Sequence, residues 1–103
     1  HIIAINEYLK DQVKDENERL KFILASYNVG QGHVEDAIKL ATKYHRDPAK
    51  WDDNVEYYLL KKSEPVYYED EAAKSGYCRG DEPVTYVREI LKQFDIYRQL
   101  LRK

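Results

Sequence analysis

The sequence predicts an all-α fold of about five to six helices. Apolar residues recur three and four positions apart in several segments, which keeps them on one face of a helix. Residues that commonly cap helices precede two of these segments, with Asp15 and Asp81 the clearest examples. Gly30 and Gly32 separate two further segments and predict a tight turn between helices. The 103 residues are enough for one small domain or a piece of one.

The first segment, residues 1 to about 12, is predicted to be the end of a helix. Ile2, Ile5 and Leu9 fall at helical spacing there. The apolar run that opens at His1 has no helix-starting residue before it, and the chain contains no methionine. We therefore expect residues 1–103 to be a piece of a longer protein.

The second segment predicts a helix from about Glu16 to Asn28. Asp15 is a suitable N-cap, and Glu18 three residues later completes a pattern like a capping box. Gly30 is expected to end the helix, because glycine tolerates the positive φ of a C-terminal cap. The expected apolar stripe comprises Leu20, Ile23, Leu24 and Tyr27, with Phe22 on its flank.

After the turn, a helix is predicted from about His33 to Tyr44. Gly32 has no Cβ, so we expect it to let the chain turn sharply into this helix. The predicted core-facing residues are Val34, Ala37, Ile38 and Ala41, with Leu40 at the edge of the stripe. The residues expected to face solvent are Glu35, Asp36, Lys39 and Lys43.

The middle of the chain predicts short elements and a loop. Asp47-Pro48 indicates a turn that carries Trp51, and a short helix is expected from about Asn54 to Leu60. From Val66 to Asp81 the pattern is weak. Gly76 and Gly80 enclose Tyr77-Cys78-Arg79 there, which favours a loop that packs back on the body, with Cys78 as a small buried side chain.

The last helix has the clearest pattern. Asp81 is a plausible N-cap, and Pro83 suits the first helical turn. The apolar residues that keep helical period to the C-terminus are Val87, Ile90, Leu91, Phe94, Tyr97 and Leu101.

Composition excludes several functional classes. Seventeen basic and 19 acidic residues give a net charge of −2, so there is no basic excess to neutralise a nucleic-acid backbone. No apolar run is long enough to span a membrane. His1, His33 and His45 have no metal-ligand spacing with Cys78 or with each other, so no metal is expected. A single cysteine excludes an internal disulfide.

The turn at residues 25–34 is the best candidate for a binding surface. Tyr27, Asn28 and the bare backbone near Gly30 would present a phenol, an amide and peptide groups together. Such groups suit a ligand rich in hydroxyls and amides, which favours a sugar. An ordinary helix–helix turn with no ligand is the alternative.

Two longer motifs carry a family resemblance. Ala25-Ser26-Tyr27-Asn28-Val29-Gly30-Gln31-Gly32-His33-Val34 resembles the Ala-x-Tyr-Asn-x-Gly-x-Gly-x-Val signature of the lysozyme-like lytic murein transglycosylases. Trp51, Gly76-Tyr77-Cys78-Arg79-Gly80-Asp81-Glu82 and Tyr86-Val87 are similar to the C-terminal part of membrane-bound members of that family. The resemblance implies that residues 1–103 are the C-terminal lobe of a lysozyme-like transglycosylase domain.

The resemblance also implies an activity. In this family one glutamate acts as acid and then as base to cleave the bond between N-acetylmuramic acid and N-acetylglucosamine, and the product is a 1,6-anhydro sugar. No cofactor is needed, and the substrate is peptidoglycan in the periplasm, at the outer membrane. The family's glutamate lies in a Glu-Ser pair, which this chain lacks. We therefore expect no catalytic residue here and no turnover by the chain alone.

Site residues follow from the same resemblance. Tyr27 matches the tyrosine that orients the catalytic glutamate, and Asn28 matches the asparagine that contacts the sugar; Gly30 belongs to the same motif. The alternative is a half-buried Tyr27 beside a capping Asn28. Glu82 and Tyr86 match an element whose tyrosine lines the family's cleft, and the alternative is an acid in the first helical turn beside a tyrosine at the edge of the core.

Two further side chains have paired interpretations. Arg79 either reaches a carboxylate of the glycan or its peptide, or forms an ion pair with Glu82. Trp51 either stacks on a sugar ring or fills space in the core.

Two other functions remain open from the sequence. The chain could be a peptidoglycan-binding piece without catalysis, or a small helical module whose tyrosine-rich face docks a protein. An apolar surface left exposed where the missing lobe would pack favours self-association.

Overall fold

The computed structural model describes residues 2–101, which form helices and no strand. The predicted all-α fold is confirmed, while the expectation for His1 lies outside the described residues. In chain order the elements are α1 (Ile2–Leu9), α2 (Glu16–Val29), α3 (Gln31–Lys43), η1 (Trp51–Val55), α4 (Glu56–Lys61), α5 (Pro65–Tyr68) and α6 (Asp81–Leu101).

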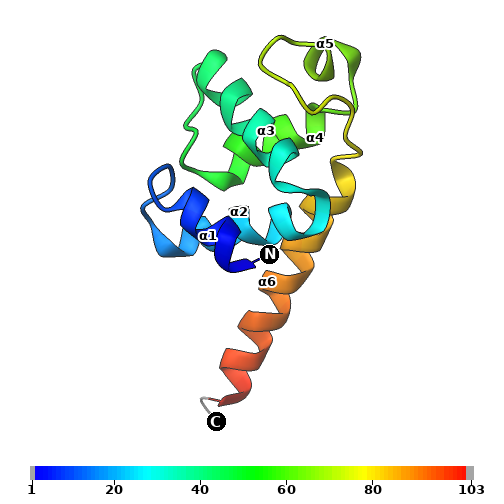
Figure 1. Ribbon diagram of the computed structural model, residues 1–103. Coiled ribbons are helices and arrows are strands. Elements are labelled where there is room, and N and C mark those ends of the chain that lie inside the picture. Colours follow the sequence, from blue (N-terminus) through cyan, green and yellow to red (C-terminus); the bar gives the residue numbers. More distant parts are fainter. Residues whose placement is uncertain (1, 102–103) are drawn as a thin grey trace.

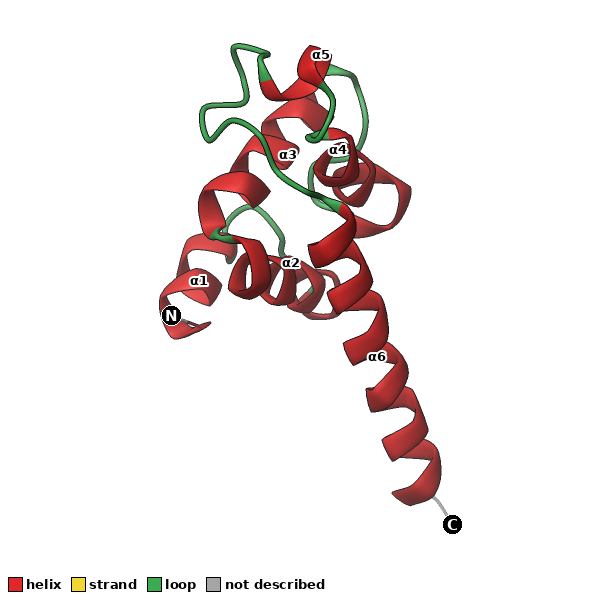
Figure 2. Cartoon of the chain, turned by 90° about the vertical axis from the view of Figure 1, so that its right-hand side faces the viewer, coloured by secondary structure: helices red, strands yellow, loops and turns green. Residues whose placement is uncertain are grey.

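The first five α-helices and η1 form a rounded body, and α6 extends away from it (Figure 1). The second view shows the C-terminal half of α6 projecting past every other element (Figure 2). The overall dimensions, 50 × 26 × 26 Å, reflect this projection. Within the body, α2 packs against α1 and α3 and also against α6.

Helix α2 begins where the sequence predicts. An Asp15 carboxylate oxygen accepts a hydrogen bond from the Glu18 backbone N–H at 3.0 Å, which confirms the N-cap. In a capping box the Glu18 side chain would accept from the Asp15 backbone N–H, but here it contacts η1 instead. Its carboxylate accepts from the Trp51 backbone N–H at 2.8 Å and so holds η1 against α2.

The predicted apolar stripe of α2 is correct in part, because Ile23 and Leu24 are partly buried against the core, but it is wrong for Tyr27. The buried residues are Phe22, Ala25 and Ser26, whereas Tyr27 is 61% exposed. Phe22 packs edge-to-face on Trp51, with ring centroids 5.6 Å apart, so this contact turns the Phe22 face inward. Residues 22, 25, 26 and 29 also have helical spacing, but small residues in that stripe make it less apolar than the predicted one.

The turn between α2 and α3 depends on Gly30. Its φ of 105° confirms the expected positive φ, and its N–H donates to the Ser26 carbonyl at 2.9 Å to end α2. Gly32 has another role from the one predicted, because it already lies inside α3. A Cβ there would lie 2.5 Å from the Ser75 Oγ, so Gly32 allows the 74–76 loop to approach closely.

The core-facing residues of α3 match the prediction, and Leu40 is also fully buried. The short helix with Tyr58 and Leu59 inward is confirmed as α4. Cys78 is 3% exposed and its N–H donates to the Lys62 carbonyl, which confirms that the 76–80 loop packs back on the body. A Cβ on Gly80 would overlap the Leu59 carbonyl, so this close approach requires glycine.

Only the first half of α6 joins the core. Pro83, Val84 and Val87 are buried. Beyond Leu91 the helix leaves the body, so the later apolar residues keep their helical spacing but face solvent. Phe94 is 45% exposed and Tyr97 is 60% exposed.

Candidate functional site

The predicted sugar-binding residues at the end of α2 are accessible. Tyr27 and Asn28 are both exposed, directly before the turn that Gly30 makes. Tyr27 is therefore not the half-buried stripe residue of the alternative interpretation. A phenol and an amide beside a glycine with open space around its Cα can contact a ligand without moving the core.

The second predicted group lies where the 76–80 loop enters α6. The Arg79 guanidinium is 3.7 Å from the Glu82 carboxylate and 3.5 Å from that of Asp81. These exposed contacts match the predicted ion pair, but they contribute little stability because water screens them. Tyr86 is half-buried one helical turn beyond Glu82.

No side-chain hydrogen bond or ion pair among residues 5–101 links Tyr27 or Asn28 to Arg79, Glu82 or Tyr86. The two groups are held relative to each other by the packing of α2 along α6. A buried polar cluster provides a second connection.

That cluster centres on Asp36 and Lys62. The Lys62 ammonium lies 2.5 Å from an Asp36 carboxylate oxygen and 2.9 Å from the His33 Nδ1. Asp36 is 2% exposed, so the prediction that it faces solvent is wrong. The sequence contains a signal for the burial of Asp36. Leu40 follows Asp36 by four residues, so both side chains lie on the same face of α3, at the edge of the predicted apolar stripe.

Asp36 also fixes the loop that leads into α6. Its carboxylate accepts from the backbone N–H groups of Lys74 and Ser75 at 3.0 and 2.8 Å. Ser75 is the residue that packs against Gly32. The cluster therefore ties the start of α3, next to the Tyr27–Asn28 turn, to the loop that carries Arg79.

His33 is the titratable member of this cluster. Burial and the nearby Lys62 ammonium lower the pKa of His33 below its ordinary value of 6.5, and the Asp36 carboxylate opposes that shift. The neutral form can accept a hydrogen bond from Lys62 at Nδ1.

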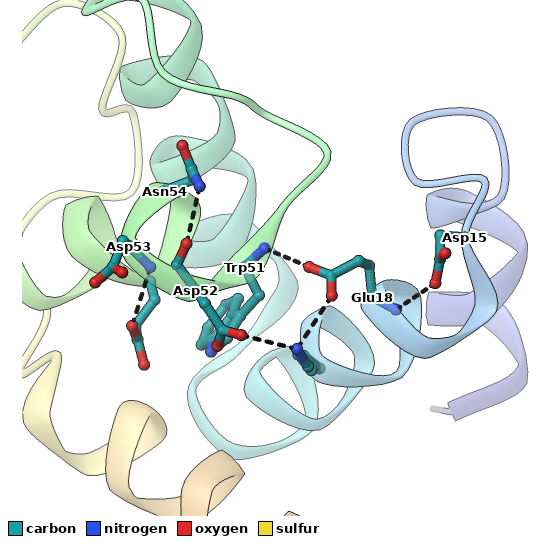
Figure 3. Close-up of polar contacts among 8 residues, drawn as sticks. Asp15, Glu18, Trp51, Asp52, Asp53 and Asn54 are labelled. Atoms are coloured by element: carbon teal, nitrogen blue, oxygen red, sulfur yellow. Dashed lines mark hydrogen bonds and ion pairs between the residues drawn. The ribbon is translucent and has the colours of Figure 1, made fainter.

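Trp51 is a packing residue, as one of its two interpretations predicted. It is 1% exposed, and its ring contacts Phe22. Figure 3 shows Glu18 reaching the Trp51 backbone from α2, while Asp52 turns toward the same side of α2. The Lys21 ammonium lies 3.1 Å from the Glu18 carboxylate and 3.1 Å from the Asp52 carboxylate.

Neither a metal site nor a membrane-spanning helix is found in the part of the chain that the structure describes. No group of three or more potential ligands among His, Cys, Asp and Glu comes together there. None of the helices within residues 2–101 is both long enough and apolar enough to cross a bilayer.

Comparison with known proteins identifies the relatives of this chain. It is 42% identical over 89 residues to a protein of Desulfosudis oleivorans named membrane-bound lytic murein transglycosylase F. Proteins of the same name from Pseudomonas fluorescens and Shewanella woodyi are 44% identical over 92 residues and 46% identical over 95 residues. The chain is homologous to part of lytic transglycosylase F. No protein-family model matches it.

The homology covers most of this chain but only a small part of each relative. The matches cover 86% of this chain for the Desulfosudis protein and 92% for the Shewanella protein, but in both cases only 19% of the relative. The chain thus spans about a fifth of the length of the lytic transglycosylases F that it matches. The resemblance seen in the two sequence motifs is confirmed.

Proposed function

We propose that this chain forms one side of a lysozyme-like transglycosylase domain and binds a peptidoglycan glycan strand at the α2–α3 turn. The observation that carries the proposal is the exposure of Tyr27 and Asn28 beside Gly30, within the motif that resembles the family signature. The homology to proteins named lytic murein transglycosylase F supports the same substrate. Arg79, Glu82 and Tyr86 are proposed to extend the surface that contacts the strand.

The catalytic acid is proposed to come from polypeptide other than these residues. A general acid at neutral pH needs a sheltered carboxyl group that keeps its proton. Among the side chains described, residues 5–101, Asp36 is a buried carboxylate, and the Asp70 side chain is only 6% exposed. The Asp36 carboxylate accepts from Lys62 and from two backbone N–H groups, so donors of the protein already occupy it. The hydrogen bond from Lys43 lowers the pKa of Asp70 below its ordinary value, which is the opposite of what a general acid needs.

In the complete domain, the proposed reaction is cleavage of the bond between N-acetylmuramic acid and N-acetylglucosamine. The sugar's own 6-hydroxyl replaces water and gives the 1,6-anhydro product. The role proposed for Tyr27 is to orient the catalytic glutamate by a hydrogen bond, and Asn28 would contact the sugar at the cleavage point. This chemistry uses protein side chains without a cofactor, and the proposed location is the periplasmic side of the outer membrane.

Glycan binding can be tested by following backbone chemical shifts while a chitin oligomer is added to the chain. We expect the largest changes at Tyr27, Asn28 and Tyr86, and at least a tenfold loss of affinity in Tyr27→Ala. Tyr77→Ala is the matched control, because Tyr77 is 58% exposed and lies outside the proposed surface. Equal affinities of Tyr27→Ala and Tyr77→Ala would disprove the proposed site.

Turnover provides a separate test. We expect no anhydro-muropeptides when purified peptidoglycan is incubated with this chain alone. Their appearance would show that the acid lies within these residues after all. Binding without turnover, even after the chain is joined to the remainder of a transglycosylase F, would instead support a non-catalytic peptidoglycan-binding protein.

A further inference from the structure

A groove of about 390 Å³ lies between α6 and the η1–α4 segment. Its volume is within the range of small-molecule pockets, roughly 300–1,000 Å³. One wall carries the carboxylates of Asp52 and Glu56. The α6 wall carries the cations of Arg88 and Lys92, with the carboxylate of Asp95 at its end. The lining includes none of the residues of the Tyr27–Asn28 turn.

Arg88 and Lys92 are two like charges on the α6 wall, and the Asp95 carboxylate on the same wall lies 3.9 Å from Arg98 rather than pairing with either of them. Arg88 and Lys92 are four residues apart on α6, where neighbouring cations repel each other. Neither of them forms an ion pair with another residue of the described chain, although lysines elsewhere, such as Lys21 and Lys43, do. A bound carboxylate would relieve this repulsion and could accept a two-pronged hydrogen bond from the arginine.

The acidic wall is held in place by contacts outside the groove. Lys21 contacts Asp52 at 3.1 Å, and the Glu56 carboxylate accepts from the Asp53 N–H at 3.3 Å. Asp53 has a φ of 61°, a conformation that costs a non-glycine residue energy and that fixes the turn between the two acids (Figure 3). Each carboxylate retains oxygen lone pairs that can accept from a ligand ammonium group.

The base of the groove is apolar. Trp51 and Val87 are each 1% exposed, and the partly buried Leu91 packs beside them. This floor suits the methyl and methylene groups between two charged ends of a ligand. Trp51 is rigid there, because its ring is fixed against Phe22 and its backbone N–H is bound by Glu18.

We propose that this groove binds a short zwitterionic peptide, with its carboxylate on Arg88 and Lys92 and its ammonium on Asp52 and Glu56. This chemical class follows from the separation of Arg88 and Lys92 on α6 from Asp52 and Glu56 on the facing wall. The further identification of the ligand as the stem peptide of peptidoglycan rests on the proposed function. The groove would then hold the peptide branch of the polymer whose glycan strand lies at Tyr27 and Asn28.

The test uses the tripeptide L-Ala-γ-D-Glu-meso-diaminopimelate as the probe. Trp51 is the only tryptophan of the chain and lines the groove, so its fluorescence reports binding. We expect Arg88→Gln/Lys92→Gln to weaken binding at least tenfold. Lys14→Gln/Lys39→Gln removes the same number of charges from exposed positions outside the groove and should bind as tightly as the parent chain.

A second comparison isolates the acidic wall. Glu56→Gln keeps an oxygen that can accept from the Asp53 N–H but removes the charge. We expect it to weaken binding of the free tripeptide about threefold or more and to have no effect on the tripeptide acetylated on both of its amino groups. A blocked, uncharged tripeptide that binds as tightly as the free one would overturn the proposal, and so would unchanged binding by Arg88→Gln/Lys92→Gln.

The two proposals fail in different ways. If the chitin oligomer binds at Tyr27 and the tripeptide does not bind, the peptide groove is wrong and the glycan site stands. If the tripeptide binds through Arg88 and the chitin oligomer does not bind, the zwitterion site stands and the proposed function is wrong.

Discussion

The Lys62 ammonium lies 2.5 Å from the Asp36 carboxylate in the interior, where Lys62 is 0% exposed and Asp36 is 2% exposed. A lysine and an aspartate separated by 26 positions in the chain thus form an internal ion pair. The pair joins α3 to the end of α4, and through Asp36 it also joins the 74–75 backbone. The pair therefore connects the start of α3, next to the Tyr27–Asn28 turn, to the segment that precedes Arg79.

Removing one member of the pair should be costly. Asp36→Ala leaves a buried ammonium and two backbone N–H groups without their acceptor, so we expect a loss of about 3–5 kcal/mol in the free energy of unfolding. The double variant Asp36→Leu/Lys62→Met should lose much less than the sum of the two single variants. Urea denaturation measures all three values.

The control is the exposed pair of Lys10 and Glu7, whose atoms are 3.1 Å apart. Lys10→Met should cost less than about 1 kcal/mol, because water screens that pair. The assigned role of Asp36 is wrong if Asp36→Ala costs no more than Lys10→Met.

Two glycines should respond differently to the same substitution. In Gly80→Ala the new Cβ would overlap the backbone of Leu59 and lie 2.5 Å from the Leu60 Cα, so the chain itself must shift. We expect a cost of about 3 kcal/mol or more. In Gly32→Ala the Cβ meets only the Ser75 hydroxyl, which can rotate away, so a cost of about 1 kcal/mol is expected. Equal thermal midpoints for the two variants would contradict this explanation.

Acid should destabilise the protein through His33. Because the pKa of His33 is lowered in the folded state, the unfolded chain takes up the proton first as the pH falls. The stability contributed by neutral His33 is therefore complete above about pH 6.5 and is lost as the pH falls through the folded-state pKa. His33→Asn keeps an acceptor for Lys62 without titrating, and should flatten the decrease of the urea midpoint between pH 7 and pH 5.

The control for this prediction is His45→Asn. His45 is exposed, lies outside the Asp36–Lys62 cluster and has a φ of 63°, which asparagine adopts readily, so this variant removes a histidine without disturbing the cluster. A pH profile that is the same in His33→Asn as in the parent chain would rule out His33 as the titrating group.

The projecting half of α6 should promote self-association. Tyr97 is 60% exposed, and Leu101 is 69% exposed, on a helix that extends beyond the body. We expect Tyr97→Lys/Leu101→Lys to weaken self-association at least tenfold in sedimentation equilibrium, since burying one such side chain is worth about 1.5–3 kcal/mol. Val66→Lys is the control, because Val66 is equally exposed, at 65%, on the short helix α5. Identical association of the two variants would contradict the prediction.

Local sequence signals predicted several ends of elements, although Asp81 is wrong as the N-cap of α6: it lies in the first helical turn, and the Gly80 carbonyl accepts from the Val84 N–H. The Asp15 cap, the positive φ of Gly30 and the enclosed loop around Cys78 all depend on residues within a few positions of each other. The helical period of α3 also gave its buried face, because that stripe is continuous and strongly apolar. The candidate glycan residues were found by motif, and their exposure agrees with that role without testing it.

Positions that depend on distant partners were predicted poorly. Phe22 faces inward because Trp51 packs against it. Position 32 favours glycine because the Ser75 side chain lies where a Cβ would be. Asp36 was assigned to solvent by its charge, yet Lys62 and the 74–75 backbone make its burial favourable. The facing charges of Arg88 and Glu56 come from separate helices and cannot be paired from sequence spacing alone.

By itself, the sequence determined the helical class, the turn at Gly30 and the relationship to lytic transglycosylase F, because hydrogen bonds within a helix and short motifs are written in neighbouring residues. Only the tertiary structure decided which faces are buried, where α6 leaves the body and how Lys62 reaches Asp36. Burial and charge pairing are properties of surfaces brought together across the chain, and their free energies depend on what each side chain meets there.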